Sequence, residues 1–225
     1  MPLAINNPIE NHSLAEKVYD ILKEQIIRGH LAPGEKLNIH KLSKEFRVSR
    51  TPVKEAINHL SLQGLITIQS RKCTFVSIWE PKKVQEMFDF RLMLEVDAAE
   101  SSFQCSDSLN LEAMDEALRE AGALFSSNEE FNYGTFTTFD QQFHLLIVDG
   151  AQNSYLRQTY NSLNAHIQIM RVYWGRARER ALQSHKEHLD VFEAFKQRSL
   201  PKVKETLSAH IINTRNNILQ ILPSP

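Results

Sequence analysis

Polar residues interrupt the apolar stripes of several long helix-like segments in the second part of the sequence. Asp140 and His144 lie four residues apart, each directly after a phenylalanine, so both side chains project from one face of a helix. His188 and His210 occupy similar apolar stripes in two later segments. One carboxylate and three imidazoles can coordinate zinc, nickel or manganese, with positions left for water or a ligand carboxylate.

Arg91 lies on a fourth apolar stripe, between Phe88 and Leu94. A buried arginine is costly unless it is paired, and an arginine that faces a metal site can clamp an acid through two parallel hydrogen bonds. The simpler interpretation of each histidine is a hydrogen-bonded core residue, and the Asp-x-x-x-His spacing alone is a weak signal. The metal site is therefore a hypothesis that requires the four stripes to converge in space.

A second group of residues that could do chemistry is basic and lies in the first part of the chain. Arg50 and Lys54 are four residues apart at the start of an expected helix, so they share a face. An arginine at the leading end of a helix in the major groove can bind a guanine edge, and a lysine suits a phosphate or a base. The hydroxyls of Ser49 and Thr51 suit phosphates when they do not cap the helix. From charge alone, a solvated basic face is an equally good interpretation.

Three helices followed by two strands must position this basic motif. Apolar spacing and turn residues predict these elements in order, at residues 14–28, at 39–46, from a cap at Ser49 or Thr51 to Gly64, at 65–69 and at 74–78. The strands are joined by a basic tip that contains Ser70, Arg71 and Lys72. This order predicts a winged helix-turn-helix whose wing tip reaches an adjacent groove or the DNA backbone.

The second part has few glycines and prolines, which leaves room for long helices. Six helices are predicted there, at about 81–104, 107–126, 129–149, 153–174, 178–197 and 200–221. Short connections favour antiparallel neighbours. The expected fold is therefore mainly α, with a winged helix-turn-helix domain at residues 1–79 and an antiparallel bundle of about six helices at 80–225.

The net charge of -1 over 225 residues conceals two parts of opposite charge. Residues 1–79 carry a net charge of +4, and residues 80–225 carry -5. Such asymmetry indicates that one part binds a polyanion. No apolar run approaches the ~20 residues of a membrane span, the N-terminus does not resemble a signal peptide, and two cysteines form no disulfide framework. We therefore expect a cytoplasmic protein with no membrane partner.

The stretch from about residue 14 to 76 resembles the GntR family of bacterial transcription regulators. The resemblance rests on IRGHLAPGEKL at 27–37, VSRTPVKEA at 48–56 and GLI at 64–66. It implies that Arg50 and Lys54 contact operator DNA and that the wing at Ser70 and Arg71 enters the minor groove. His40 occupies a second-helix position that is often basic and in contact with DNA in this family.

The second part resembles the FCD effector domain that accompanies one large GntR subgroup, and its six helices resemble the VanR-like branch. The resemblance rests on FRLMLE at 90–95, FDQQFH at 139–144, NSYL at 153–156, EH at 187–188 and His210. It implies that the metal ligands are Asp140, His144, His188 and His210. It also implies that Arg91 anchors a carboxylate.

Together these patterns predict a homodimeric transcription regulator, usually a repressor in this family, and not an enzyme. Two winged helices would bind a palindromic operator, because the two-fold symmetry of the protein is matched by half-sites. A small organic acid bound to the metal and to Arg91 would shift the two DNA-binding domains between arrangements. Zinc is the first choice of metal, with nickel and manganese as alternatives.

Two other functions remain open at this point. The same Asp and His set could activate water in a metal-dependent hydrolase or lyase, although the sequence offers no separate acid–base residue. Alternatively, the metal site is vestigial or purely structural, and DNA binding is constitutive.

Overall fold

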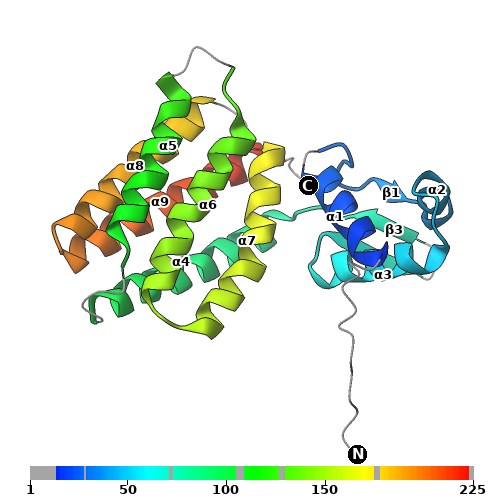
Figure 1. Ribbon diagram of the computed structural model, residues 1–225, viewed down its shortest axis with the longest axis horizontal. Coiled ribbons are helices and arrows are strands. Elements are labelled where there is room, and N and C mark those ends of the chain that lie inside the picture. The colour runs from blue at the N-terminus through cyan, green and yellow to red at the C-terminus, as the bar shows by residue number, and fades with distance from the viewer. Residues whose placement is uncertain are drawn as a thin grey trace, which may run out of the picture. The chain divides into compact units, whose positions relative to one another are not determined.

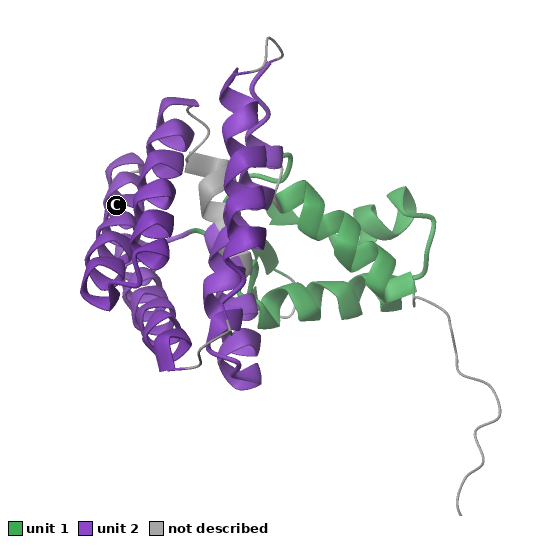
Figure 2. Ribbon diagram, turned by 60° about the vertical axis from the view of Figure 1, so that its left-hand side comes forward, with its two compact units in different colours: residues 1–78 green, residues 79–225 purple. Residues whose placement is uncertain are grey.

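The computed structural model describes residues 14–27, 29–70, 73–104, 109–126, 130–174 and 178–222, without the side chains of residues 27, 70, 165–166 and 168–174. The chain forms two compact units, residues 1–78 and 79–225, coloured green and purple in Figure 2. The mainly α fold, with a winged helix-turn-helix and then a helical bundle, is confirmed.

The first unit combines three helices with a small antiparallel sheet (Figure 1). Its elements are α1 (Leu14–Ile27), β1 (Lys36–Leu37), α2 (Ile39–Glu45), α3 (Arg50–Leu62), β2 (Ile66–Ser70) and β3 (Cys73–Val76). β3 is the central strand and pairs with both β1 and β2. The sequence did not predict β1, because a strand of two residues is too short to show a period-2 pattern.

Apolar faces of α1 and α3 pack together to form the core of this unit. The buried side chains are Val18, Leu22, Ile26, Val53, Ala56, Ile57 and Leu60, whereas Leu14 and Ile21, which follow the same apolar spacing in α1, are exposed. Burial of each large aliphatic side chain contributes about 1.5–3 kcal/mol. This packing fixes α3 by its inner face and leaves its outer face to solvent.

The two helices of the helix-turn-helix begin differently. Asn38 caps α2, since its side-chain oxygen accepts from the backbone N–H groups of His40 and Lys41 at 2.9 and 3.1 Å. Ser49 occupies the capping position of α3 but makes no side-chain capping bond, and Thr51 lies inside the helix. Of the two residues predicted to cap α3, Ser49 therefore occupies the N-cap position. Its hydroxyl makes no capping hydrogen bond.

The second unit contains six helices, as predicted. They are α4 (Pro81–Gln104), α5 (Leu111–Ser126), α6 (Tyr133–Gly150), α7 (Ser154–Trp174), α8 (Arg178–Lys196) and α9 (Leu200–Ile221). α5 and α6 begin about four residues later than predicted. Asn110 and Asn132 accept hydrogen bonds from backbone N–H groups three residues ahead, so they set these helix starts.

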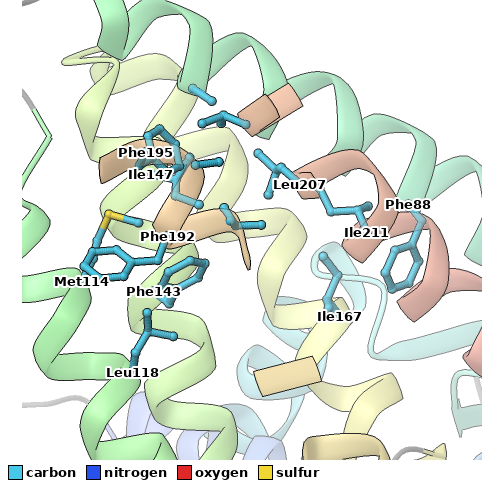
Figure 3. Close-up of a cluster of buried hydrophobic side chains, with 14 of the residues drawn as sticks. Phe88, Met114, Leu118, Phe143, Ile147, Ile167, Phe192, Phe195, Leu207 and Ile211 are labelled. Carbon is cyan, nitrogen blue, oxygen red and sulfur yellow. The ribbon is translucent and has the colours of Figure 1, made fainter. Parts of the chain in front are cut away.

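A continuous apolar cluster fills the bundle, with Phe143, Ile147, Phe192, Leu207 and Ile211 among its members (Figure 3). These side chains come from α6, α8 and α9, the same helices that carry the candidate metal ligands. The cluster therefore holds those helices at fixed separations around the polar residues. None of the described helices is both long and apolar enough to cross a membrane.

Candidate functional site

The candidate DNA-binding residues gather where α3 begins. Ser49 precedes the helix, Arg50, Thr51 and Lys54 lie in its first two turns, and all four are exposed. The N-terminal end of a helix carries free N–H groups and a partial positive charge, which both favour phosphate. The structure thus places two positively charged side chains and two hydroxyls beside the end of α3 that attracts anions.

The side chain of His40 in α2 is hydrogen-bonded to that of Arg50 in α3. Arg50 Nη2 donates a hydrogen bond to His40 Nδ1 over 3.1 Å, and both side chains are exposed. Because a guanidinium only donates, the proton of a neutral His40 ring must lie on Nε2. Two residues that the sequence placed in the DNA-contacting set are therefore adjacent in space, although they belong to different helices.

The predicted wing tip lies largely outside the described residues. Arg71 and Lys72 fall outside them, and Ser70 is described as the last residue of β2 but without its side chain. The strands on either side pair with a register shift between Ile68 and Ser70. The role of the wing in DNA binding stays a prediction.

Three imidazoles meet in the interior of the bundle. His188 Nε2 lies 3.1 Å from His144 Nε2 and 3.1 Å from His210 Nε2, and all three side chains are buried. Nitrogen ligands at about 2.0–2.1 Å from a shared ion are separated by roughly 2.9–3.4 Å, depending on the coordination geometry. The three atoms therefore have the spacing of ligands around one cation.

Asp140 lies beside this cluster. Its Oδ1 is 3.5 Å from His188 Nε2, and its side chain is buried. Asp140 and His144 both come from α6, one turn apart, as their spacing predicted. The structure therefore brings all four predicted ligands together, with the three imidazoles in mutual reach and the carboxylate next to His188.

The protonation of the imidazole rings in this cluster favours the binding of a cation. His144 Nδ1 lies 2.7 Å from Glu95 Oε2, and His210 Nδ1 lies 2.8 Å from Glu187 Oε2. A carboxylate only accepts, so each Nδ1 carries a proton, and the Nε2 of each neutral ring presents a lone pair. His188 Nε2 can donate a hydrogen bond to only one of these two Nε2 atoms. The donor set therefore fits a divalent cation, which would accept all three lone pairs.

Glu95 of α4 connects the cluster to the rest of the bundle interior. Besides His144, its carboxylate accepts from Arg91 Nε at 2.5 Å and from the hydroxyl of Tyr160 at 2.9 Å. All four side chains are almost completely buried. Glu95 therefore fixes the ring of His144 and neutralises the charge of Arg91.

The charges of this network decide its protonation. Burial alone would raise the pKa of Glu95, but Arg91 and His144 outweigh it and hold the pKa at about 2. Burial lowers the pKa of His144 to about 4, despite the opposite effect of Glu95. Burial and the adjacent carboxylate raise the pKa of Tyr160. Near neutral pH the network is an ionised carboxylate paired with an arginine, beside a neutral imidazole.

Glu187 has the corresponding position behind His210. Its Oε1 accepts from Asn213 Nδ2 at 3.0 Å and from Gln183 Nε2 at 3.3 Å, while Oε2 accepts from His210. Burial opposes ionisation, but these hydrogen bonds prevail and lower the pKa of Glu187. Carboxylates behind metal-binding histidines orient the ring and make the ligand more basic.

The sequence analysis assigned no role to either carboxylate. Glu95 carried a usable signal, because it follows Arg91 by four residues and so lies on the same buried face of α4. Glu187 carried a weaker signal, because a glutamate directly before a histidine is common on the exposed face of any helix. Only the convergence of α4, α6, α8 and α9 gives these residues a function.

Comparison with known proteins agrees with this division of the chain. The profile of the gntR family of bacterial regulatory proteins matches residues 14–76. The FCD domain profile matches residues 86–213, which is more than half of the chain.

Individual relatives match along nearly the whole length. The HTH-type transcriptional regulator YdhC of Bacillus subtilis is 28% identical over 91% of this chain and 90% of its own. The transcriptional repressor RspR of Escherichia coli is 24% identical over 92% of this chain and 89% of its own. A GntR regulator structure from Rhodococcus sp. RHA1 covers 92% of this chain and 97% of its own, with 18% identity and a TM-score of 0.76, and so shares the fold.

Proposed function

Because the chain belongs to the GntR family of bacterial regulatory proteins and carries an FCD domain, we propose that it represses transcription in response to a small carboxylate. It is a DNA-binding transcription regulator, as its relatives are, and not a hydrolase or lyase. One of those relatives, RspR, is named a repressor. Such a regulator works in the cytoplasm, where it meets DNA.

The DNA-binding step uses two copies of the first unit on a palindromic operator. Arg50 contacts a guanine edge, since its exposed guanidinium stands at the start of α3 and His40 steadies it. Lys54, Ser49 and Thr51 contact phosphates. The wing residues Ser70, Arg71 and Lys72 contact the neighbouring minor groove. The homodimer supplies both half-sites.

The metal-binding step uses Asp140, His144, His188 and His210. The observation that carries it is the buried meeting of three imidazole Nε2 atoms at ligand spacing. Zinc is our choice, because nitrogen and oxygen ligands in a four-residue set suit it. When bound, the ion supplies a Lewis-acidic position for a ligand carboxylate. Glu95 and Glu187 orient two of the rings by accepting from their Nδ1 protons.

Arg91 is the proposed cationic partner of the effector. Its Nε donates to Glu95, while its buried Nη1 has no hydrogen-bond partner among the residues that the structure describes. A buried guanidinium N–H without an acceptor costs free energy, and a ligand carboxylate would satisfy it. We propose that effector binding stabilises one arrangement of the two DNA-binding units over the other. A ligand acts in this way only if it binds the two arrangements with different affinity.

The proposal is tested by selection of bound sequences from a random DNA library, followed by affinity measurements on the selected operator. We expect an inverted repeat whose affinity falls steeply with salt. Zinc-loaded protein is then titrated with a panel of small organic acids, and at least one acid should change operator affinity. His144→Ala protein should lose this response and keep its operator affinity.

Three outcomes would contradict the proposal. Failure to enrich any sequence would refute operator recognition. A full response to acids in His144→Ala protein that contains no metal would refute a metal-dependent effector site. Operator binding that no acid changes, in protein that retains its zinc, would leave the ion with a structural role only.

A further inference from the structure

The side chain of Arg50, at the start of α3, is tied to the other helix of the helix-turn-helix. Its Nη2 donates to Nδ1 of His40 in α2 over 3.1 Å, although both side chains are exposed. An exposed arginine otherwise samples many rotamers, and that freedom is lost when the side chain binds a base. A bond within the protein that already orders the guanidinium therefore lowers the entropic cost of recognition.

Backbone hydrogen bonds hold His40 in place opposite Arg50. The backbone N–H of His40 donates to Asn38 Oδ1 at 2.9 Å, and its carbonyl accepts from the hydroxyl of Ser43 at 2.9 Å. The carbonyl of Ser43, a buried residue, accepts from the backbone N–H of Val48 at 3.0 Å, in the turn between α2 and α3. Ser43 thus connects the first turn of α2 to the chain that enters α3. The position of the imidazole relative to the guanidinium is therefore set by the backbone of the motif.

The bond to His40 limits how Arg50 can meet a base. A guanidinium offers two parallel pairs of N–H groups, one from Nε and Nη2 and one from Nη1 and Nη2. Each pair uses one of the two hydrogens of Nη2, so the bond to His40 occupies one pair and leaves the other intact. Guanine presents the two acceptors O6 and N7, which match one such pair. The tethered guanidinium therefore has one bidentate orientation toward guanine, whereas a free guanidinium has two.

We propose that His40 is a positioning residue that sets the base selectivity of Arg50 through its acceptor atom Nδ1, and not through a DNA contact of its own. The proposal rests on the proposed function, in which Arg50 contacts a guanine edge. An amide oxygen can replace the imidazole acceptor, but a lysine cannot, because an ammonium group only donates. A residue that contacted phosphate directly would show the reverse, since lysine is a good phosphate ligand. The two roles therefore predict opposite results for the same substitutions.

The test measures the affinity of full-length protein for the operator selected from the random library, and for the same operator with one G·C pair changed to A·T. The chosen pair is the one at which Arg50→Ala reduces discrimination. His40→Ala and His40→Lys should lower the ratio of the two affinities about three- to tenfold, and His40→Gln should retain most of it. His40→Lys should also bind unrelated DNA more tightly, because it adds a positive charge. His30→Ala is the matched control, since His30 is an exposed histidine of the same unit that is hydrogen-bonded to Gln25. It should keep the wild-type ratio.

Three results would overturn the role of His40. The first is a wild-type ratio in His40→Ala protein, and the second is a wild-type ratio in His40→Lys protein, which would indicate a direct contact made by charge. The third concerns the Arg50→Ala background, where His40→Ala should leave operator affinity unchanged; a loss as large as in wild-type protein would show that the two residues act independently. The Tm of each variant should stay at the wild-type value, because the His40 side chain is exposed.

A failure of the proposed function gives a different pattern. If Arg50→Ala discriminates every base pair as the wild-type protein does, base recognition by Arg50 is refuted, and the positioning role of His40 with it. If Arg50→Ala loses discrimination at one pair while His40→Ala retains it, only the role of His40 is refuted.

Discussion

Glu95 Oε2 lies 2.7 Å from His144 Nδ1, and both side chains are completely enclosed by the bundle. The same carboxylate accepts from Arg91, so one group serves a candidate metal ligand and a candidate effector anchor. Removal of a partner from a buried ion pair leaves an uncompensated charge, which is more damaging than the loss of the attraction itself.

The first prediction concerns this pair. Glu95→Gln should lower the free energy of unfolding by about 3–5 kcal/mol, because it leaves the charge of Arg91 buried without a counter-charge. Combining it with Arg91→Met should restore part of that loss, as a double-mutant cycle in urea denaturation would show. Additive effects of the two changes would contradict the pairing. Lys83→Gln with Glu86→Gln, an exposed pair on the same helix, should show almost no coupling.

The second prediction concerns metal binding. Zinc added at one hundred times its Kd should stabilise the protein by about 2.7 kcal/mol, seen as a rise in Tm, and a chelator should reverse it. His144→Ala should abolish this rise, because it removes one of three converging nitrogens. His185→Ala is the control, since His185 is a buried histidine of α8 outside the cluster. A rise that survives in His144→Ala would place zinc elsewhere.

The third prediction concerns DNA recognition. Arg50→Ala should weaken specific operator binding by about 1–3 kcal/mol and relax selectivity at one base pair. Lys54→Ala should weaken binding to all sequences and reduce the slope of log affinity against log salt by about 0.9. Lys17→Ala, on the exposed side of α1, serves as the charge control in gel-shift titrations. Equal discrimination by wild-type and Arg50→Ala protein would remove Arg50 from base recognition.

The fourth prediction compares two helix starts. Asn38→Ala should destabilise the first unit by about 0.5–2 kcal/mol, because it removes two capping hydrogen bonds from α2. Ser49→Ala should change stability little, since Ser49 makes no capping bond, but it should weaken DNA binding. Thermal unfolding and gel shifts on both variants give the comparison. Equal destabilisation by the two changes would show that Ser49 caps α3 after all.

Local sequence determined most of the fold. The spacing of Val53, Ile57 and Leu60 specified the inner face of α3, and with it the outward direction of Arg50. The six bundle helices followed from long apolar periods with few breaks. Helix starts were less certain, because Asn110 and Asn132 end the preceding loop through capping bonds that apolar spacing does not encode.

Tertiary structure decided what the polar residues of the bundle do. The four-residue spacing placed Asp140 and His144 on one face, since helix geometry relates near neighbours in the chain. No local rule relates His144 to His188, 44 residues away, or to Glu95, 49 residues away. Their contacts depend on how the apolar faces of four helices pack, so only the tertiary structure decided that these nitrogens and the carboxylates behind them form one site.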